Sequence, residues 1–387
     1  MCEHSMKARR TEKINPFIVM DVLERCQELE RTGSHVIHLE VGEPDFDTPS
    51  VINEAGMEAM RDGKTQYTHS LGLLELREAV CDDYRKRYGV EVSPERIIIT
   101  SGTSPAMLLV FSALLNPGEK IILSDPGYAC YPNFINYVDG VPKFVAVNED
   151  EGFQFDPERV AEKVDAQTKA ILINSPSNPT GNLLSPERMK RLAELGPYII
   201  SDEIYHGLVY GEKEHSILEF TDHAFVLNGF SKRYAMTGWR LGYVIAPEEF
   251  IRPMQKMQQN FFISAGDFVQ WAGVAALTRA EDVVRRMRDI YDERRRYIVP
   301  RLQELGFGIT TEPRGAFYVL ANAKRFSSDS YRFAFEILEG AHVGVTPGID
   351  FGKNAEGYIR FCYANSLENI TLAMDRLQSF LKAYPAG

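Results

Sequence analysis

The chain has 387 residues, of which 44% are hydrophobic, so it is long enough for more than one domain and apolar enough for a large core. Its formal net charge of −11 at pH 7 argues against binding to nucleic acid or to an anionic membrane, because both require a concentrated basic face. The five cysteines lie far apart without paired metal-ligand spacing, so we expect reduced thiols, no metal site and a cytoplasmic location: Cys2, Cys26, Cys81, Cys130 and Cys362.

We expect neither a membrane-spanning helix nor a secretion signal. The longest apolar run, residues 107–115, is interrupted by Ser112 and is too short to cross a bilayer. Residues 1–10 are polar and basic, but no apolar stretch with a cleavage site follows them.

Apolar β-branched runs alternate with helical stretches in the first three quarters of the chain. Strands buried on both faces are predicted at residues 96–100, 120–123, 170–173 and 198–200. The clearest helices are predicted at 105–115 and 185–195, the second one opening with Ser185-Pro186-Glu187. This alternation predicts an α/β fold with a parallel sheet wrapped by helices.

The pattern changes near residue 291, where an arginine-rich helix is followed by short strands at 307–310 and 316–320 and by a C-terminal helix. We interpret this part as a smaller α+β domain to which both chain ends contribute. The predicted division is 1–44 (N-terminal arm and part of the small domain), 45–285 (large domain) and 286–387 (small domain), with the boundary inside a long helix. Acidic residues interleave with the arginines of 285–296, which indicates a solvated helix face.

Polar residues that directly follow apolar strands are the best site candidates, since ligands of open α/β sheets bind beyond the carboxyl ends of the strands. Thr103 and Ser104 follow the first strand and open a helix, where they suit a phosphate, although an ordinary helix cap is the better explanation when this segment is taken alone. Tyr128 follows the second strand and can stack on a flat heteroaromatic ring or serve as a core tyrosine.

Asn178 stands in the segment that follows the third strand, where it can donate to a phenolic oxygen or simply build a turn. The fourth strand is followed by Asp202 and Tyr205. A carboxylate at a strand end can keep a pyridine nitrogen protonated. Lys232 alone would be a solvated surface charge, but it stands in a segment that also supplies Arg240, a cation suited to phosphate. An amine, a carboxylate and a phosphate-binding cation are what pyridoxal 5'-phosphate requires.

These segments, in this order, resemble the class I and II aminotransferases of pyridoxal-phosphate fold type I. The motifs that carry the resemblance are Asn178-Pro179-Thr180-Gly181, Asp202-Glu203-Ile204-Tyr205, Ser231-Lys232 and Gly238-Trp239-Arg240. The resemblance implies a mostly parallel seven-stranded sheet and the cofactor pyridoxal 5'-phosphate. It further implies that Lys232 joins the cofactor and moves protons, that Asp202 binds the pyridine nitrogen, and that Asn178 and Tyr205 bind the phenolic oxygen. Tyr128 would stack on the ring, and the phosphate would be held by Thr103, Ser104, Ser231 and Arg240.

The resemblance also implies three residues beyond the sheet. Tyr67 matches the residue that crosses from the other subunit to the phosphate, which implies a homodimer with a shared active site. Arg360 matches the arginine that binds the substrate α-carboxylate, and Gly42 belongs to a loop whose backbone approaches it; without the resemblance they would be a surface charge and a turn glycine. The chain departs from the pattern at Gly229, where many members have a hydroxyl.

The expected activity is a ping-pong transamination between an L-amino acid and a 2-oxo acid, in amino acid biosynthesis. The apolar segment 16–20 favours neutral or aromatic amino acids, while an aspartate donor stays open. A β-lyase of the same fold would share every cofactor contact. A non-catalytic ligand-binding regulator is the other alternative, but such proteins usually carry an added DNA-binding segment.

Overall fold

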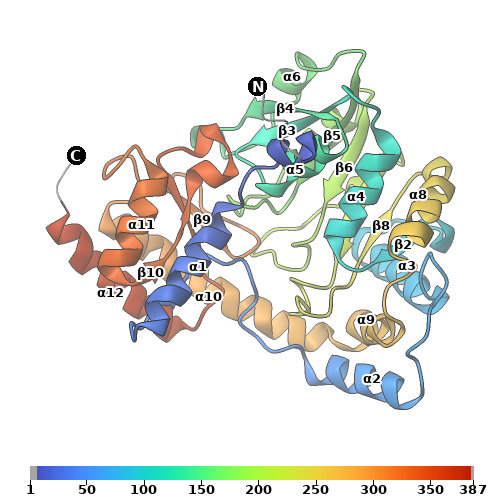
Figure 1. Ribbon diagram of the computed structural model, residues 1–387, viewed down its shortest axis with the longest axis horizontal. Coiled ribbons are helices and arrows are strands. Elements are labelled where there is room, and N and C mark those ends of the chain that lie inside the picture. The colour runs from blue at the N-terminus through green and yellow to red at the C-terminus, as the bar shows by residue number, and fades with distance from the viewer. Residues whose placement is uncertain (1–6, 385–387) are drawn as a thin grey trace.

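The computed structural model describes residues 7–384, so Cys2 lies outside the described residues. Its centre is a seven-stranded sheet in the order β2-β8-β7-β6-β5-β3-β4 (Figure 1). The strands are β2 (Ile97–Thr100), β3 (Lys120–Asp125), β4 (Val141–Ala146), β5 (Thr168–Asn174), β6 (Tyr198–Asp202), β7 (Ala224–Gly229) and β8 (Gly242–Ile245). The predicted α/β fold with a mostly parallel seven-stranded sheet is confirmed.

Only β8 runs against the other strands of this sheet. It pairs antiparallel with both β2 and β7, whereas the pairs from β7 to β4 are all parallel. β2 is an edge strand whose one neighbour in the sheet is β8. Since β2 still points the same way as β3, β5, β6 and β7, the carboxyl ends of all five meet at one edge.

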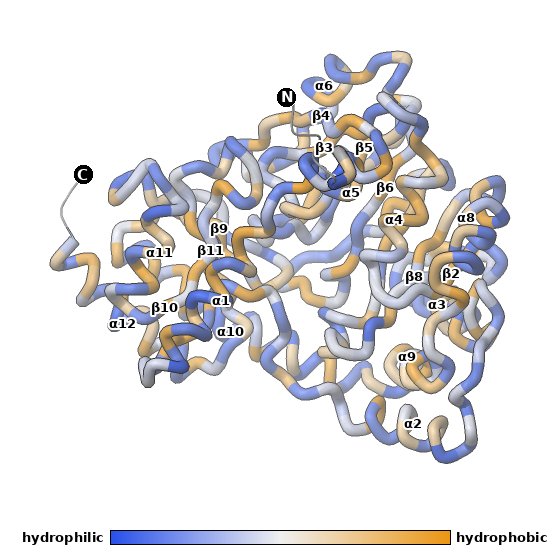
Figure 2. Tube along the Cα trace, viewed as in Figure 1, coloured by the Kyte–Doolittle hydropathy of each residue, from blue (hydrophilic) through white to orange (hydrophobic). Residues whose placement is uncertain are grey.

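Successive residues of these strands point to opposite faces, and both faces are covered. Ile97, Ile122, Ile171, Ile199 and Val226 lie in one apolar cluster, while Ile98, Ile121, Leu172, Ile200 and Phe225 lie in another. The prediction of strands buried on both faces is confirmed. Figure 2 shows hydrophobic stretches in β2, β8 and α9.

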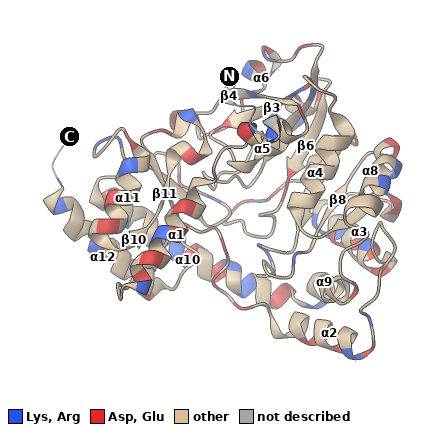
Figure 3. Ribbon diagram, viewed as in Figure 1, with Lys and Arg blue, Asp and Glu red and all other residues tan. Residues whose placement is uncertain are grey.

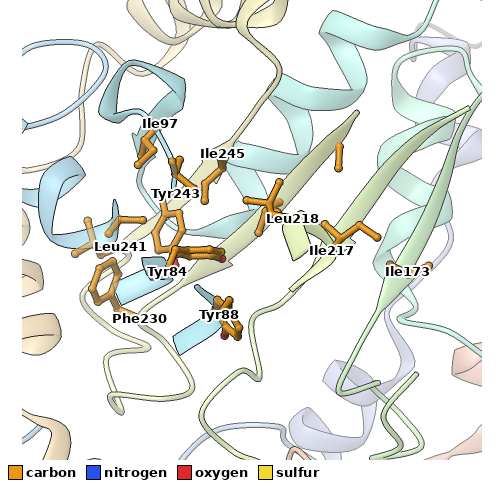
Figure 4. Packing of buried hydrophobic residues seen from close by; sticks show 14 of the residues in the cluster. Tyr84, Tyr88, Ile97, Ile173, Ile217, Leu218, Phe230, Leu241, Tyr243 and Ile245 are labelled. Carbon is orange, nitrogen blue, oxygen red and sulfur yellow. The ribbon is translucent and has the colours of Figure 1, made fainter. Parts of the chain in front are cut away.

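The first cluster packs under one set of helices, and aromatic residues of α3 fill its end next to β8 (Figure 4). These helices include α2 (Ser50–Arg61), α3 (Leu74–Tyr88), α6 (Pro157–Ala161), α7 (Pro186–Ala193) and α9 (Asp267–Arg279). The second cluster packs under α4 (Thr103–Leu114), α5 (Cys130–Tyr137) and α8 (Glu248–Phe261). The two predicted helices correspond to α4 and α7, and the Ser185 side chain caps α7.

A smaller α+β part lies beside the large sheet and combines both ends of the chain (Figure 1). It contains the antiparallel sheet β11-β12-β9 and the parallel pair β1-β10. Its elements are α1 (Ile18–Arg31), β1 (Ile37–His38), β9 (Tyr318–Asn322), α11 (Ser330–Ala341), β10 (Val343–Gly344), β11 (Thr346–Pro347), β12 (Tyr358–Cys362) and α12 (Leu367–Ala383). The predicted strand at 307–310 is wrong, because Gly308 makes only an isolated bridge to Asn322.

Helix α10 (Glu281–Leu305) joins the two parts without a break. Val284 and Met287 pack in the large core, whereas Ile298 and Leu302 pack in the small one. We propose that the domain boundary lies within this helix.

The prediction that the arginines of 285–296 form a solvated face is wrong for two of them. Arg294 is buried and ion-paired with Asp45, and Arg295 is buried and ion-paired with Glu312 and with Asp292 of the same helix. Asp45 and Glu312 come from other segments of the chain, so the local pattern does not show them. Elsewhere basic and acidic residues are intermixed, as on α1 and α10 in Figure 3. Between residues 7 and 384, no helix combines the length and apolar character that a bilayer crossing requires.

Candidate active site

A cavity of about 200 Å³ opens at the carboxyl edge of the large sheet and is closed from the other side by the small sheet. Nine of the twelve residues predicted for the site line it: Gly42, Thr103, Ser104, Tyr128, Asn178, Asp202, Tyr205, Lys232 and Arg360. Ser231, Arg240 and Tyr67 do not line it. The convergence of strand ends thus brings together residues that lie far apart in the sequence.

Asp202 forms the floor of the cavity at the end of β6 and is only 4% exposed. Its Oδ2 accepts a hydrogen bond from the Tyr131 hydroxyl at 2.6 Å, and its Oδ1 accepts one from the Ile204 N–H at 3.1 Å. Burial raises the pKa of Asp202 to about 6, while these two donors oppose the rise. The carboxylate is therefore oriented and still has room for a cationic partner.

Lys232 projects from the loop after β7, and its Nζ donates to the Gly42 carbonyl at 2.5 Å. Burial in the cavity wall, assisted by the nearby guanidinium groups of Arg360 and Arg240, lowers the pKa of Lys232 from 10.5 to about 8. An amine with this pKa has a substantial neutral fraction near physiological pH, which is the form that acts as nucleophile or base.

Arg360 on β12 is a buried cation without an anionic partner. It is 2% exposed, and its guanidinium donates to the Asn178 amide oxygen at 2.9 Å, to the Thr346 hydroxyl at 3.1 Å and to the Glu40 carbonyl. These partners are uncharged, no ion pair within residues 7–384 involves Arg360, and its Nε has no hydrogen-bond partner. A buried guanidinium in this state is prepared to receive an anion.

The first turn of α4 forms a second anion-binding feature. Its N-cap, Gly102, has a φ of +100° and supplies no side-chain cap, so the first N–H groups of the helix are free. Arg240 lies against this turn, since a Cβ atom at Gly102 would be 2.7 Å from its Nη2. Arg240 itself has a φ of +54°, a conformation that costs a non-glycine residue on the order of 1 kcal/mol.

Gly229 and Gly42 both occupy positions where a side chain would be crowded by its surroundings. A Cβ atom at Gly229 would lie 3.0 Å from the Leu241 carbonyl oxygen, a tight contact with the neighbouring strand. A Cβ atom at Gly42 would lie 1.9 Å from the Tyr318 hydroxyl oxygen, which itself contacts the Tyr205 hydroxyl at 2.8 Å.

The opposite wall of the cavity is apolar and comes partly from the N-terminal segment. Phe17, Val19 and Met20 line it, and the Phe17 ring meets the edge of Tyr128 at a centroid distance of 6.0 Å. Tyr67 is far more exposed, at 81%, and lines a separate surface hollow with residues 264–268.

Sequence reasoning missed three residues that orient the predicted ones. Tyr131 bonds Asp202; Asn174 donates to the Asp202 carbonyl and accepts from the Asn178 N–H; Tyr318 contacts Tyr205 and lies under the Arg360 guanidinium at 4.5 Å. Tyr131 and Asn174 stand in segments already identified as strand ends, so their position was a usable signal. Tyr318 carried none, because it reaches the cavity only through the packing of the small sheet.

Comparison with known proteins agrees with this geometry. The family model "Aminotransferase class I and II" matches residues 34–377. The (5-formylfuran-3-yl)methyl phosphate transaminase of Methanocaldococcus jannaschii is 41% identical, over 97% of this chain and 100% of its own length. The aspartate aminotransferase of Pyrococcus horikoshii is 38% identical, over 97% of both chains. The crystal structure of Thermus thermophilus aspartate aminotransferase with maleate superimposes with a TM-score of 0.93 at 37% identity, over 97% and 99% of the two chains.

The fold and the cavity therefore define an α/β enzyme of amino-group transfer. The chain belongs to the class I and II aminotransferases. It is a transaminase, as predicted, and the comparisons favour this activity over the β-lyase and regulator alternatives.

Proposed function

We propose that this aminotransferase binds pyridoxal 5'-phosphate in the 200 Å³ cavity and prefers an amino acid with a neutral or aromatic side chain. The observation that carries the proposal is the buried Arg360 guanidinium without a carboxylate, at one end of a cavity whose wall also holds an amine of lowered pKa. When bound, the cofactor supplies a pyridine ring that accepts the electrons left at Cα after loss of its proton.

The residues of the cavity fit this cofactor. Lys232 would join it covalently, Asp202 would lie beside the ring nitrogen and Tyr128 against the ring. The Asn178 amide nitrogen is available for the phenolic oxygen, since only its oxygen accepts from Arg360, and the Tyr205 hydroxyl is the second donor. The phosphate would bind at the free first turn of α4 with Thr103, Ser104, Ser231 and Arg240.

Each residue also has a task toward the substrate. Arg360 would bind the α-carboxylate through two parallel N–H groups and so hold the amino acid in one orientation. Lys232 Nζ would take the α-proton as a general base and return it as a general acid. Gly42 would let the backbone approach the same carboxylate, because its lack of a side chain leaves room for Tyr318.

The donor preference rests on the charges of the cavity wall. Among the described residues that line it, Lys232 and Arg360 are the cations, and both already have tasks. No further cation of this chain is left there for a distal carboxylate, whereas Phe17, Val19 and Met20 offer apolar contact.

We further propose a homodimer in which Tyr67 reaches the phosphate of the partner subunit. Its 81% exposure, on the rim of a hollow outside its own cavity, supports this placement. The cytoplasmic location and the biosynthetic role stay predictions.

A screen of L-amino acids with 2-oxoglutarate as acceptor tests the proposed donor class. We expect glutamate to form, with the highest kcat/KM for aromatic or neutral donors. A kcat/KM for aspartate that is about tenfold above that of every aromatic and neutral donor would overturn the preference, since about 1.4 kcal/mol of extra binding would then require a distal cation. Pyruvate and ammonia without glutamate would instead indicate a lyase.

A further inference from the structure

Three side chains with metal-ligating atoms meet where α1, β1 and β10 pack together in the small domain. Cys26 lies on α1, His38 ends β1, and Glu40 follows two residues later. The Cys26 thiol, a ring nitrogen of His38 and a carboxylate oxygen of Glu40 lie within 4.8 Å of one another. Cys26 and Glu40 are fully buried, while the His38 side chain is 32% exposed and leaves a route from solvent.

The Glu40 carboxylate is only half satisfied. Its Oε1 contacts His38 Nδ1 at 2.6 Å, but its Oε2 has no hydrogen-bond partner although the residue has no exposed surface. An unpaired oxygen on a buried carboxylate is costly and is unusual in a native fold. It is explained when a cation completes the coordination of this group.

Gly344 on β10 leaves the space that these ligand atoms occupy. It is the pairing partner of His38, and a Cβ atom there would lie 2.1 Å from Glu40 Oε2 and 3.0 Å from Cys26 Sγ. Any other residue at this position would push one of the two atoms away. The local backbone is therefore compatible with both ligands facing a common point.

The outer ring nitrogen of His38, Nε2, faces a carboxylate, as is common for histidines in metal sites. This Nε2 lies 3.1 Å from the Glu30 carboxylate, while Nδ1 faces Glu40. Histidines that bind metals commonly donate their second ring N–H to a carboxylate, which fixes the tautomer and the ring orientation. Glu30 is thus a positioning residue that directs Nδ1 into the cluster.

We propose that a zinc-class divalent cation binds to Cys26 Sγ, His38 Nδ1 and the Glu40 carboxylate, with one coordination position left for water. Thiolate, imidazole and carboxylate together are a zinc set, whereas Mg²⁺ and Ca²⁺ select oxygen ligands. No sequence motif indicates this site, because its ligands are too unevenly spaced to form one.

The cation would connect this site to the cavity through the backbone of one residue. The Glu40 carbonyl oxygen accepts hydrogen bonds from Arg360 and, at 3.0 Å, from the Thr346 hydroxyl. Binding of its carboxylate to a metal would fix α1 to the segment that supports the Arg360 guanidinium. This role is structural and is independent of the proposed amino donor.

The test uses the full-length protein loaded with its cofactor, freed of metal by a chelator and then dialysed against Zn²⁺. We expect one tightly bound Zn²⁺ per protomer, and zinc-edge X-ray absorption should show one sulfur neighbour at about 2.3 Å. Cys26→Ala should abolish this stoichiometric binding. Glu30→Gln should weaken it by about 10-fold to 100-fold, the usual effect of removing a second carboxylate from a metal-bound histidine.

Cys81→Ala is the matched control, because Cys81 is a partly buried thiol on α3 outside the cluster. It should bind Zn²⁺ as the parent protein does. Absence of stoichiometric Zn²⁺, a zinc spectrum without sulfur, or unchanged affinity in Cys26→Ala would overturn the proposal and leave a metal-free hydrogen-bonded cluster. If Cys26→Ala fails to fold, the zinc-edge spectrum of the parent protein and the Zn²⁺ affinity of Glu30→Gln, which changes an exposed residue, still test the proposal.

Discussion

Substitution of Arg360 by lysine should impair the binding of amino acids while leaving the charge of the cavity unchanged. Both terminal nitrogens of the guanidinium donate to uncharged partners, Asn178, Thr346 and the Glu40 carbonyl, while Nε has no partner, so this planar group keeps N–H donors for a carboxylate. Lysine offers a single point charge on a flexible chain. The variant therefore loses at least one charge-assisted hydrogen bond to the substrate.

A hydrogen bond to a charged group contributes about 1.5–3 kcal/mol. At about 1.4 kcal/mol for each factor of ten, kcat/KM for the preferred amino acid should fall by about 10-fold to 150-fold in Arg360→Lys. The lost interaction is with the α-carboxylate. For the corresponding amine, which lacks the carboxylate, the rate constant should therefore change by no more than about twofold, the scatter expected for independent sites.

The assay is single-turnover reaction of the cofactor-loaded protein with each compound, followed by absorbance. Arg295→Lys serves as the matched control, because Arg295 is equally buried but pairs with Asp292 and Glu312 outside the cavity. Two results would refute the reasoning: Arg360→Lys with nearly unchanged kcat/KM for the amino acid, or an equal loss for the amino acid and for the carboxylate-free amine.

Three further predictions concern the lysine, the subunit interface and the glycine of the cavity. The rate at which cofactor-free protein takes up pyridoxal 5'-phosphate should rise with pH through about 8, since the pKa of Lys232 is lowered to about 8 and the neutral amine reacts; a rise centred near 10.5, the ordinary lysine value, would contradict this cause. Mixed dimers of Tyr67→Phe and Lys232→Ala subunits should bind pyridoxal 5'-phosphate more tightly and have a higher transaminase activity than dimers of either variant alone, because one of their two sites regains both residues. No gain on mixing would contradict a shared site. Gly42→Ala should lower activity by displacing Tyr318, and the added change Tyr318→Phe should restore part of it by removing the oxygen that lies 1.9 Å from the new Cβ; failure of any rescue in steady-state kinetics would show that the collision is not the cause.

The part of the site that follows the strands of the large sheet could be predicted from the sequence. Asp202 ends β6 and Asn178 lies in the loop that follows β5, and parallel strands bring such ends to one edge of the sheet. The resemblance then supplied Arg360 and Gly42, which lie in the small domain and have no such local signal.

The remaining errors come from contacts between distant segments. Arg294 and Arg295 looked solvated because their acidic partners Asp45 and Glu312 are separated from them in sequence. The direction of β8 and the position of Tyr318 likewise depend on which strands become neighbours. The local periodicity of the sequence does not predict strand neighbours.

Borohydride reduction of the cofactor-loaded protein, followed by mass spectrometry of its peptides, tests the central claim most directly. The account predicts a yellow protein that loses its colour on reduction and carries the pyridoxyl phosphate mass on Lys232 alone. A protein that stays colourless with added pyridoxal 5'-phosphate, or that carries the label on another lysine, would contradict it.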